Sequence, residues 1–504
     1  MADTYPPEIT PSEGARLTEA ARDWSLAHGL TVRPSPAVIA SEADPHGILA
    51  TAVPVTLFPS PFPKVCFDQG VAVQTAYNEL YASISQDEEF LARIVKDIGD
   101  SDDFITELWK VHLRVKKEGY VQSKSLGLFR SDYMVHQDSS NSEPRIKQVE
   151  FNTIASSFGG LSSQTSQLHK EGTYIRYLAS TEYQLLEKPI KSSSLNLPPN
   201  NSTHGLAAGI TTAFSAYGPS VSGRTKCVIF LVQDGERNIF DQKHLEYAVQ
   251  STGDISVFRL PFSQILQHTH LTQDRQLLYT PPRLTNHTYE VAVVYMRAGY
   301  GPGDYPDTRA WEARYQVERS AAIKCPSVLT QIAGTKKVQQ VLATPDSTAL
   351  RQYLSNNCDA VAGTFTNIYP LDTSPAGLDA RALAADPEEC KKYVLKPQRE
   401  GGGNNIYRAA IPAFLRKLPE AHWPSYILME LITPPPVRNT ILRNGELERG
   451  GVICELGIYG TCLWDQGKIL HNEQAGYLLR TKGDQSEEGG VAAGFGCMDS
   501  CALV

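Results

Sequence analysis

Two stretches early in the chain, residues 71–86 and 103–117, carry apolar side chains at intervals of three and four. This spacing gathers apolar side chains on one face of a helix, so it predicts two amphipathic helices in a mostly helical N-terminal part. Residues 145–153 are expected to form a strand. Residues 188–205, which are rich in Ser, Asn and Pro, predict a linker.

A different pattern follows this linker. Apolar runs at residues 227–232 and 291–296 predict buried strands, with helices expected from Asp241 and over residues 308–322. Strands that alternate with helices indicate a small parallel sheet. Further strands are predicted, among helices, at residues 393–395, 426–431 and 451–459. The pattern as a whole therefore predicts a mixed α/β protein.

The changes of pattern divide the chain into three expected parts. The first is residues 1–216, the second is the α/β section at residues 217–325, and the third is residues 326–504. A chain of 504 residues is long enough to form two or more hydrophobic cores. The loop at residues 483–496 is rich in Gly and Ala, which allows either a mobile lid that binds an anion or a flexible loop near the C-terminus.

Composition excludes several classes of protein. The net charge of -8 argues against a nucleic-acid-binding surface. The sequence contains no apolar run near the ~20 residues that a membrane-spanning helix needs, and no secretory signal is recognised at its start. The nine cysteines are odd in number and include no CxxC pair, which favours reduced thiols. We therefore expect a cytoplasmic protein that binds neither nucleic acid nor membranes.

The stretch from Lys396 to Asn405, Lys-Pro-Gln-Arg-Glu-Gly-Gly-Gly-Asn-Asn, directly follows the predicted strand at residues 393–395. Glycines let the backbone approach a ligand closely, and successive N–H groups can hold a phosphate. Lys396 and Arg399 add positive charge, and Glu400 adds an oxygen for a cation. A bare triple glycine would more often be a flexible turn, but these neighbours favour an anion site.

Glu150 and Asn152 are two residues apart on the predicted strand at residues 145–153, so their side chains point to the same face. A carboxylate beside an amide oxygen suits Mg²⁺, although such a pair is usually just a solvated strand face. The turn that follows, residues 156–160, is expected to offer hydroxyls and free N–H groups to a ligand.

Several cations stand where a ligand crevice is expected. Arg297 and Tyr300 come just after one parallel strand and Gln233 ends another, and crevices form at the carboxyl ends of such strands. Arg130 and Arg297 are candidates for binding carboxylates. Lys336 could reach a phosphate, although a lone lysine is usually only solvated. Since no nucleophile and base form a recognisable pattern, this inventory suits phosphoryl transfer.

These motifs resemble those of the eukaryotic glutathione synthetases, a family of ATP-grasp ligases. The resemblance spans nearly the whole chain in the family's order. It is carried by Arg130-Ser-Asp-Tyr-Met134, Glu150-Phe-Asn-Thr153, Ser157-Phe-Gly-Gly-Leu161, Glu236-Arg-Asn-Ile-Phe-Asp-Gln242, Trp311-Glu-Ala-Arg314, Glu318-Arg-Ser320, Ala333-Gly-Thr-Lys-Lys-Val-Gln-Gln340, Leu395-Lys-Pro-Gln-Arg-Glu-Gly-Gly-Gly-Asn-Asn405, Tyr426-Ile-Leu-Met-Glu430, Glu455-Leu-Gly457, Leu478-Leu-Arg-Thr-Lys482 and Gly489-Gly-Val-Ala-Ala-Gly494.

The resemblance implies an ATP-grasp fold with an antiparallel-sheet core, a small parallel-sheet substrate domain, and a mobile lid near residues 365–450. It also implies ATP- and Mg²⁺-dependent joining of γ-glutamylcysteine to glycine through an acyl phosphate, in a homodimer.

The family pattern carries roles over to individual positions. It places Mg²⁺ on Glu150, Asn152 and Glu400. It places ATP against Glu150, Lys336, Lys396, Gly401, Gly402, Gly403, Asn404, Asn405, Tyr407, Met429, Glu430, Glu455, Lys482 and Glu488. It places the dipeptide against Arg130, Ser156, Ser157, Gln233, Arg297, Tyr300, Arg480, Val491 and Ala492. Arg480, Lys396, Gly401 and Gly402 are the expected catalytic positions.

Three positions depart from the family pattern. Ala155 stands where the pattern has a serine, Ala298 where it has an aspartate, and Glu488 where it has an aspartate. The first two put details of the dipeptide contacts in doubt, while Glu488 keeps a carboxylate. Two alternatives remain at this point: a related ligase that uses another amine acceptor, and a non-catalytic nucleotide-binding protein of the same fold.

Overall fold

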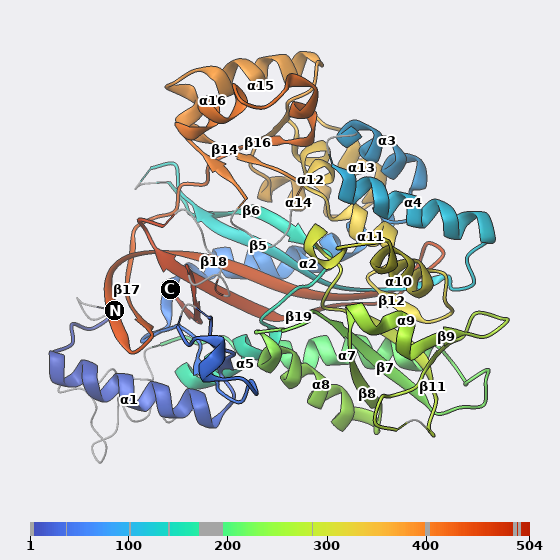
Figure 1. Ribbon diagram of the computed structural model, residues 1–504. Coiled ribbons are helices and arrows are strands. Elements are labelled where there is room, and N and C mark those ends of the chain that lie inside the picture. Colours follow the sequence, from blue (N-terminus) through green and yellow to red (C-terminus); the bar gives the residue numbers. More distant parts are fainter. Residues whose placement is uncertain are drawn as a thin grey trace.

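The structure, a computed structural model, describes residues 5–36, 38–99, 102–139, 142–170, 195–284, 286–398, 404–486, 491 and 495–504. It confirms a mixed α/β fold with antiparallel and parallel strands. Among the described residues, the largest sheet has 13 strands and passes through the centre of the molecule (Figure 1).

The part of the large sheet that builds the site is mostly antiparallel. Its long strands pair side by side over many residues, so side chains far apart in sequence are aligned with one another. In spatial order the strands are β17 (Val437–Arg443), β3 (Val55–Thr56), β20 (Cys497–Asp499), β19 (Lys468–Gly483), β18 (Glu446–Asp465), β5 (Lys124–His136) and β6 (Arg145–Asn152).

The predicted parallel strands belong to the same sheet, which they join through a single parallel pairing with β5. The parallel strands are β12 (Ile323–Cys325), β11 (Tyr289–Met296), β7 (Lys226–Val232) and β8 (Ser256–Pro261), with β10 (Leu277–Tyr279) and β9 (Thr269–Leu271) added antiparallel. The boundaries at residues 216 and 325 therefore stay predictions.

Helices cover both faces of the large sheet (Figure 1). One face packs against α2 (Lys64–Ile84), where Gly70 lies against Ile458, and the other against α7 (Ser202–Ala216), where Gly209 lies against Thr461. Further helices beside α2 are α3 (Glu88–Ile98), α4 (Asp103–Glu118), α10 (Thr308–Glu318), α11 (Val328–Ala333), α12 (Lys336–Ala343), α13 (Ala349–Tyr353) and α14 (Cys358–Thr364). Those beside α7 are α5 (Gly159–Lys170) and α8 (Ile239–Gly253), while α1 (Pro11–Ala27) precedes them all and α9 (Ile265–His268) follows β8.

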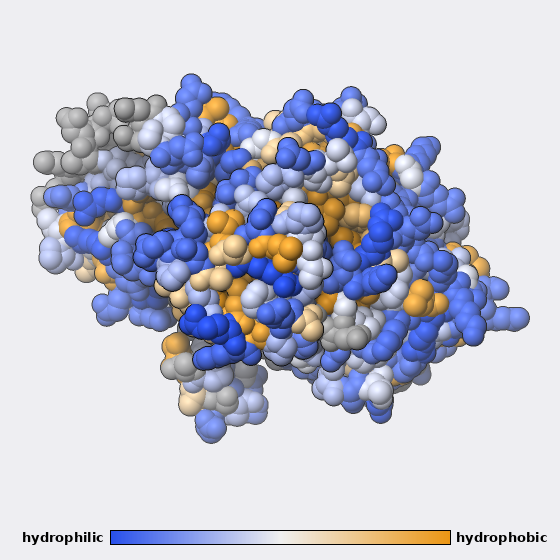
Figure 2. Space-filling view, turned by 90° about the horizontal axis from the view of Figure 1, so that it is seen from above, coloured by the Kyte–Doolittle hydropathy of each residue, from blue (hydrophilic) through white to orange (hydrophobic). Residues whose placement is uncertain are grey.

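A smaller antiparallel sheet lies above the large one in Figure 1. One face of it has a hydrophobic cluster of its own, while Ile368, Val394, Ile427 and Met429 on its strands belong to a cluster that flanks the large sheet. When the molecule is viewed from above, from the side of the small sheet, most of its surface is hydrophilic, with small hydrophobic patches near the middle (Figure 2). The elements are β13 (Ile368–Pro370), β16 (Ile427–Glu430), β14 (Tyr393–Lys396) and β15 (Ile406–Tyr407), packed with α15 (Pro375–Ala385) and α16 (Ala410–Leu415).

Two predicted elements differ from the structure. The helix expected to reach residue 322 ends at Glu318, because the N–H of Ala321 donates instead to the carbonyl of Arg275 as the chain turns into β12. The predicted linker runs into α7 at Ser202, whose hydroxyl donates to the Gly159 carbonyl at 2.6 Å and so anchors that helix on α5. Residues 188–194 of the linker lie outside the described residues.

All nine cysteines are free, as the sequence predicts, and eight of them are buried. Burial raises the pKa of Cys66 to about 11 and those of Cys454 and Cys462 to about 12. No helix in the described part of the chain combines the length and the apolar character that crossing a bilayer requires.

Candidate active site

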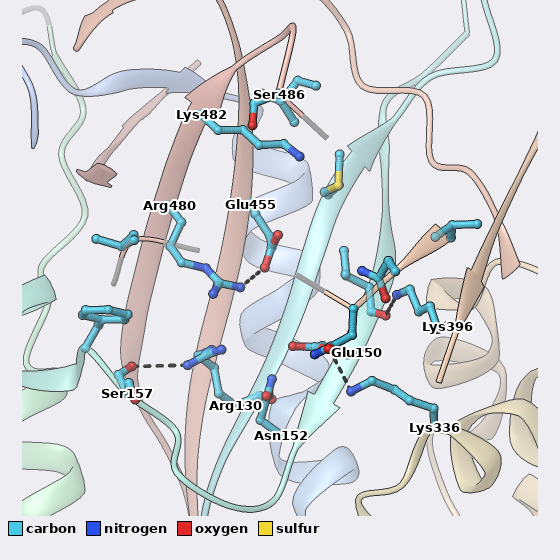
Figure 3. Close-up of a pocket in the computed structure, with 18 of the residues that line it drawn as sticks. Arg130, Glu150, Asn152, Ser157, Lys336, Lys396, Glu455, Arg480, Lys482 and Ser486 are labelled. Atoms are coloured by element: carbon cyan, nitrogen blue, oxygen red, sulfur yellow. Dashed lines mark hydrogen bonds and ion pairs between the residues drawn. The ribbon is translucent and has the colours of Figure 1, made fainter. Parts of the chain in front are cut away.

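A cavity of about 800 Å³ lies between the large sheet and the small one. Side chains from both sheets line it (Figure 3). Of the 25 residues predicted to bind ligands or metal, those that line it are Arg130, Glu150, Asn152, Ser157, Gln233, Arg297, Tyr300, Lys336, Lys396, Asn404, Asn405, Tyr407, Met429, Glu430, Glu455, Arg480, Lys482 and Val491.

Strand pairing explains how the polar floor of the cavity forms. Arg480 of β19 stands opposite Glu455 of β18, while Asp132 of β5 stands opposite Glu150 of β6. Strand side chains alternate between faces, so Glu150 and Asn152 point into the cavity and the intervening Phe151 points to α2. There Phe151 stacks on Tyr81, with ring centroids 3.9 Å apart. The predicted shared face of Glu150 and Asn152 is confirmed.

A glycine in β18, Gly457, leaves space for charged side chains on the floor of the cavity. Gly457 of β18 pairs with Asp132, and Tyr459 pairs with Arg130. A Cβ atom at Gly457 would lie 2.7 Å from Cδ of Arg130 and 2.8 Å from Oδ1 of Asp132. Those distances are shorter than van der Waals contact, so only glycine leaves space for the two charged side chains to lie across the strand.

Asp132 is a central residue that the sequence analysis did not single out. Its fully buried carboxylate accepts from Arg130 in a two-pronged pair, from Arg480 at 3.0 Å and from the Asn152 amide at 3.1 Å. Burial alone would lower the pKa of Arg130, but the Asp132 charge outweighs it and raises that pKa. Because the Asn152 amide nitrogen is engaged, its amide oxygen is the atom that can ligate a cation. The sequence did contain a sign of this role, because Arg130 and Asp132 are two residues apart on one strand and so point to the same face as each other.

Positive charge surrounds Glu150. Its Oε2 lies 2.9 Å from Nζ of Lys336, at the first residue of α12, and Lys396 stands at the end of β14 with Nζ 3.0 Å from the Val149 carbonyl (Figure 3). Burial would raise the pKa of Glu150, but Lys336 and Lys396 together hold it below its ordinary value. This end of the cavity therefore combines an ionised carboxylate with two cations.

Arg480 links the two ends of the cavity. Its guanidinium contacts Glu455 and Asp132, as the dashed line to Glu455 shows in Figure 3. Burial raises the pKa of Glu455, and Arg480 opposes that rise. Lys482, two residues farther along the same face of β19, also points into the cavity (Figure 3). Lys482 therefore lies beyond Arg480, on the side away from Arg130, and the pair adds two cations to the large-sheet wall.

At the other end, the Ser157 turn joins two arginines. The Ser157 carbonyl accepts from Arg130 at 3.2 Å and from the Tyr459 hydroxyl at 2.6 Å, and its hydroxyl accepts from Arg297 at 2.8 Å. Arg297 is buried, and its Nε has no hydrogen-bond partner among the described residues. A ligand carboxylate at this end would meet two buried guanidinium groups.

The expectation of free N–H groups in this turn is wrong. The Asp241 carboxylate accepts from the N–H groups of Phe158 and Gly160 at 2.8 Å and from that of Leu161 at 3.2 Å. Asp241 thus caps α5 and fixes the turn instead of leaving donors for a ligand. Local sequence could not reveal this, because the capping residue lies 80 to 83 positions away.

Some predicted residues take other places. The Ser156 hydroxyl donates to the Leu128 carbonyl at 3.0 Å, and its side chain lines a much smaller void. The structure also brings Glu236, Arg237 and Asn238 to the cavity wall, which the predicted residues omitted although their motif was noted. Outside the described residues lie Glu400, Gly401, Gly402, Gly403, Glu488 and Ala492.

Comparison with known proteins identifies the family of this chain. The family model of the eukaryotic glutathione synthase ATP-binding domain matches residues 11–503. The glutathione synthetase large chain of Schizosaccharomyces pombe is 40% identical over 516 residues, which cover 98% of this chain and 99% of that protein. Glutathione synthetase of Homo sapiens is 39% identical over 491 residues, which cover 96% of each chain.

A solved structure shows the same fold. The apo form of a glutathione synthetase-like effector from Globodera pallida superposes with a TM-score of 0.73 at 22% identity, covering 99% of this chain and 98% of that one. Together, the family model and the curated relatives show that the chain belongs to the eukaryotic glutathione synthetase family of ATP-dependent ligases.

Proposed function

We propose that this protein joins γ-glutamylcysteine to glycine, with release of ADP and phosphate from ATP. The observation that carries the proposal is a single cavity with two different ends. Glu150, Lys336 and Lys396 suit a metal–nucleotide at one end, Arg130 and Arg297 suit a carboxylate-bearing substrate at the other, and Arg480 lies between them.

The reaction that the family resemblance implies is compatible with this arrangement. The cysteinyl carboxylate of the dipeptide attacks the γ-phosphorus of ATP, the bond to the β-phosphate oxygen breaks, and an acyl phosphate and ADP result. The amine of glycine then attacks the acyl carbon, loses a proton, and phosphate leaves. Arg480 would hold the carboxylate against the phosphoryl group, and Lys336, Lys396 and Lys482 would offset the phosphate charge.

Mg²⁺ held by Glu150 and Asn152 would help to offset the negative charge of the phosphates. The chemistry of the available donors fits this ion, because Glu150 and Asn152 offer oxygen atoms on one face of β6. In the described part of the chain, no three His, Cys, Asp or Glu side chains converge on a metal site. The oxygen atoms of Glu150 and Asn152 suit Mg²⁺, which commonly takes one or two protein carboxylates together with substrate phosphates.

The third proposed Mg²⁺ ligand, Glu400, comes from the family pattern alone. Glu400→Gln should raise the Mg²⁺ concentration that gives half-maximal turnover, because one anionic ligand is lost. An unchanged Mg²⁺ titration would remove Glu400 from the set while leaving the proposed reaction intact.

The direct test of function is ADP release from the purified protein. We expect release only when γ-glutamylcysteine and glycine are both present. Release with neither would indicate a plain ATPase, and nucleotide binding without turnover would indicate a binding protein. Replacing glycine with β-alanine or serine tests the acceptor, since a pocket discriminates one methylene by only about 1–3 kcal/mol.

The proposal extends to assembly and movement. A homodimer is the commonest closed arrangement, and sedimentation of the purified protein would detect it.

Residues 365–450 and 483–496 would close over the site to keep water from the acyl phosphate. A cytoplasmic location, consistent with the free thiols, would be checked by imaging the tagged protein.

A further inference from the structure

A short loop after β11 carries a carboxylate with three neighbouring donors. Asp304 ends the 3₁₀ turn Pro302–Asp304. Its Oδ2 accepts from the backbone N–H groups of Gly299 at 2.9 Å and Tyr300 at 3.2 Å. Its Oδ1 accepts from the side-chain amide of Gln233, at the end of β7, at 2.9 Å. One carboxylate thus ties the ends of two parallel strands together.

The backbone held by Asp304 is fixed on its other side as well. The Gly299 carbonyl accepts from the Tyr305 hydroxyl at 3.2 Å and from the Gln331 amide at 2.9 Å. Gly299 has φ +86°, and a Cβ atom there would lie 2.8 Å from Cε of Met296. The peptide that leads into Tyr300 is therefore held by hydrogen bonds from both faces and has little freedom to move.

Asp304 acts on the cavity without lining it. Gln233 and Tyr300 are lining residues, whereas the Asp304 side chain lies behind them. Ala298, at the position where the family pattern has an aspartate, is fully buried and has no polar side-chain atom to contribute. In this chain the carboxylate that organises the loop therefore comes from Asp304, six positions farther along.

Asp304 also decides which atom Gln233 can offer. An ionised carboxylate only accepts hydrogen bonds, so it must be met by the NH₂ group of the Gln233 amide. The amide oxygen is then the atom that Gln233 has for a ligand, and an oxygen acceptor suits a donor such as a primary ammonium group. We propose that Asp304 is a positioning residue that makes Gln233 an ammonium acceptor and thereby helps the cavity select dipeptides with a free amino group.

This inference rests on the proposed function. γ-Glutamylcysteine has its amino group at the end remote from the carboxylate that reacts. Gln233 directly follows β7, and Tyr300 lies in the loop after β11 that also carries Arg297, whereas Lys336 begins α12 and Lys396 ends β14. The amino group would therefore reach the wall that Asp304 organises, while the reacting carboxylate reaches Arg480.

The test compares γ-glutamylcysteine with glutarylcysteine, the analogue in which hydrogen replaces the amino group. We expect the wild-type protein to prefer γ-glutamylcysteine in kcat/KM by at least about tenfold, the effect of one hydrogen bond to a charged group. Asp304→Asn replaces the carboxylate with an amide, which can both donate and accept. The side-chain amides of residues 304 and 233 can then each rotate by 180°, so the Gln233 oxygen no longer has to face the ligand. The preference should then fall by at least about threefold, with KM for ATP unchanged.

Two further variants separate positioning from a general structural effect. Gln233→Leu removes the acceptor and should lower the preference as D304N does, and combining the two should lower it no further. Asp307→Asn is the matched control, because Asp307 belongs to the same loop but caps α10 through the N–H groups of Arg309 and Ala310. It should leave the preference at its wild-type value.

The outcomes separate the two proposals. A D304N protein that keeps the wild-type preference would overturn the role of Asp304 while leaving the ligase function untouched. A wild-type protein without turnover would contradict the ligase function. Calorimetric binding of the two dipeptides then measures the same preference without catalysis, so equal affinities in wild type and D304N would again overturn the role of Asp304.

Discussion

The two walls of the cavity are built in different ways. In the large-sheet wall, Arg130 and Arg480 both donate to Asp132, and strand pairing fixes the positions of all three. The small-sheet wall has a hydrophobic cluster of its own on one face, while residues such as Val394 and Met429 pack into the cluster that flanks the large sheet. The first wall is preorganised for its ligand by direct ion pairs, whereas the second is attached to it by apolar packing and by contacts such as that of Lys396 with the Val149 carbonyl.

The sharpest test of the preorganised wall is Arg480→Ala. It removes the cation between the reacting groups and leaves Asp132 and Glu455 without its charge. We expect kcat to fall by about 100-fold or more, as when a group that stabilises the transition state is removed. ADP release measures this, with Arg438→Ala, an exposed position of β17, as the control. Turnover within about threefold of wild type, roughly 0.7 kcal/mol of barrier, would refute the role.

Gly457→Ala tests whether strand geometry sets the same wall. The new methyl group would press on Arg130 and Asp132, so we expect about 1–3 kcal/mol of destabilisation together with a higher KM for the dipeptide. Gly450→Ala is the matched control on β18, because a Cβ there has no atom within 4 Å. If chemical denaturation and KM are the same for the two variants, the floor is not packed as described.

Glu150→Gln tests whether Glu150 is ionised and paired with the lysines beside it, through the pH dependence of stability. The pKa of Glu150 is lowered in the folded protein, so its ionised form stabilises the fold above the pKa of the unfolded chain, about 4.3. Wild type should be more stable than E150Q by about 1 kcal/mol at pH 7. The difference should shrink as the pH falls below about 4.3 and through the folded-state pKa. The melting temperatures of wild type and E150Q are measured as a function of pH. A difference between them that stays constant down to pH 3 would contradict the ionised pair of Glu150 with Lys336.

The smallest expected effect lies where the walls meet. Gln398 accepts from the N–H of Lys337 at 3.0 Å and donates to the Ser425 carbonyl at 2.9 Å, so it connects α12 to the small-sheet unit. Gln398→Ala should raise KM for ATP by about two- to tenfold, the range of a neutral hydrogen bond, and leave KM for the dipeptide unchanged. Equal changes in both constants would show that the walls do not act as separate units.

Local patterns in the sequence could predict much of this molecule. Apolar runs located β7 and β11, and the two-residue spacing of Glu150 and Asn152 located the carboxylate end of the site. The length of β18 could not be read in this way, because only residues 451–459 of its 20 residues stood out as a strand. Long-range pairing was equally hidden: Asp132 meets Arg480 across 348 positions, and only the register of three strands brings them together.

The buried cysteines have a consequence for a protein proposed to handle thiols. Disulfide exchange requires a thiolate, and burial raises the pKa of Cys66, Cys454 and Cys462 far above neutral pH. Such thiols neither attack nor are easily reached by small disulfides. The eight buried cysteines would therefore not form mixed disulfides with oxidised substrate or product, which leaves Cys358 as the one described cysteine that is not buried.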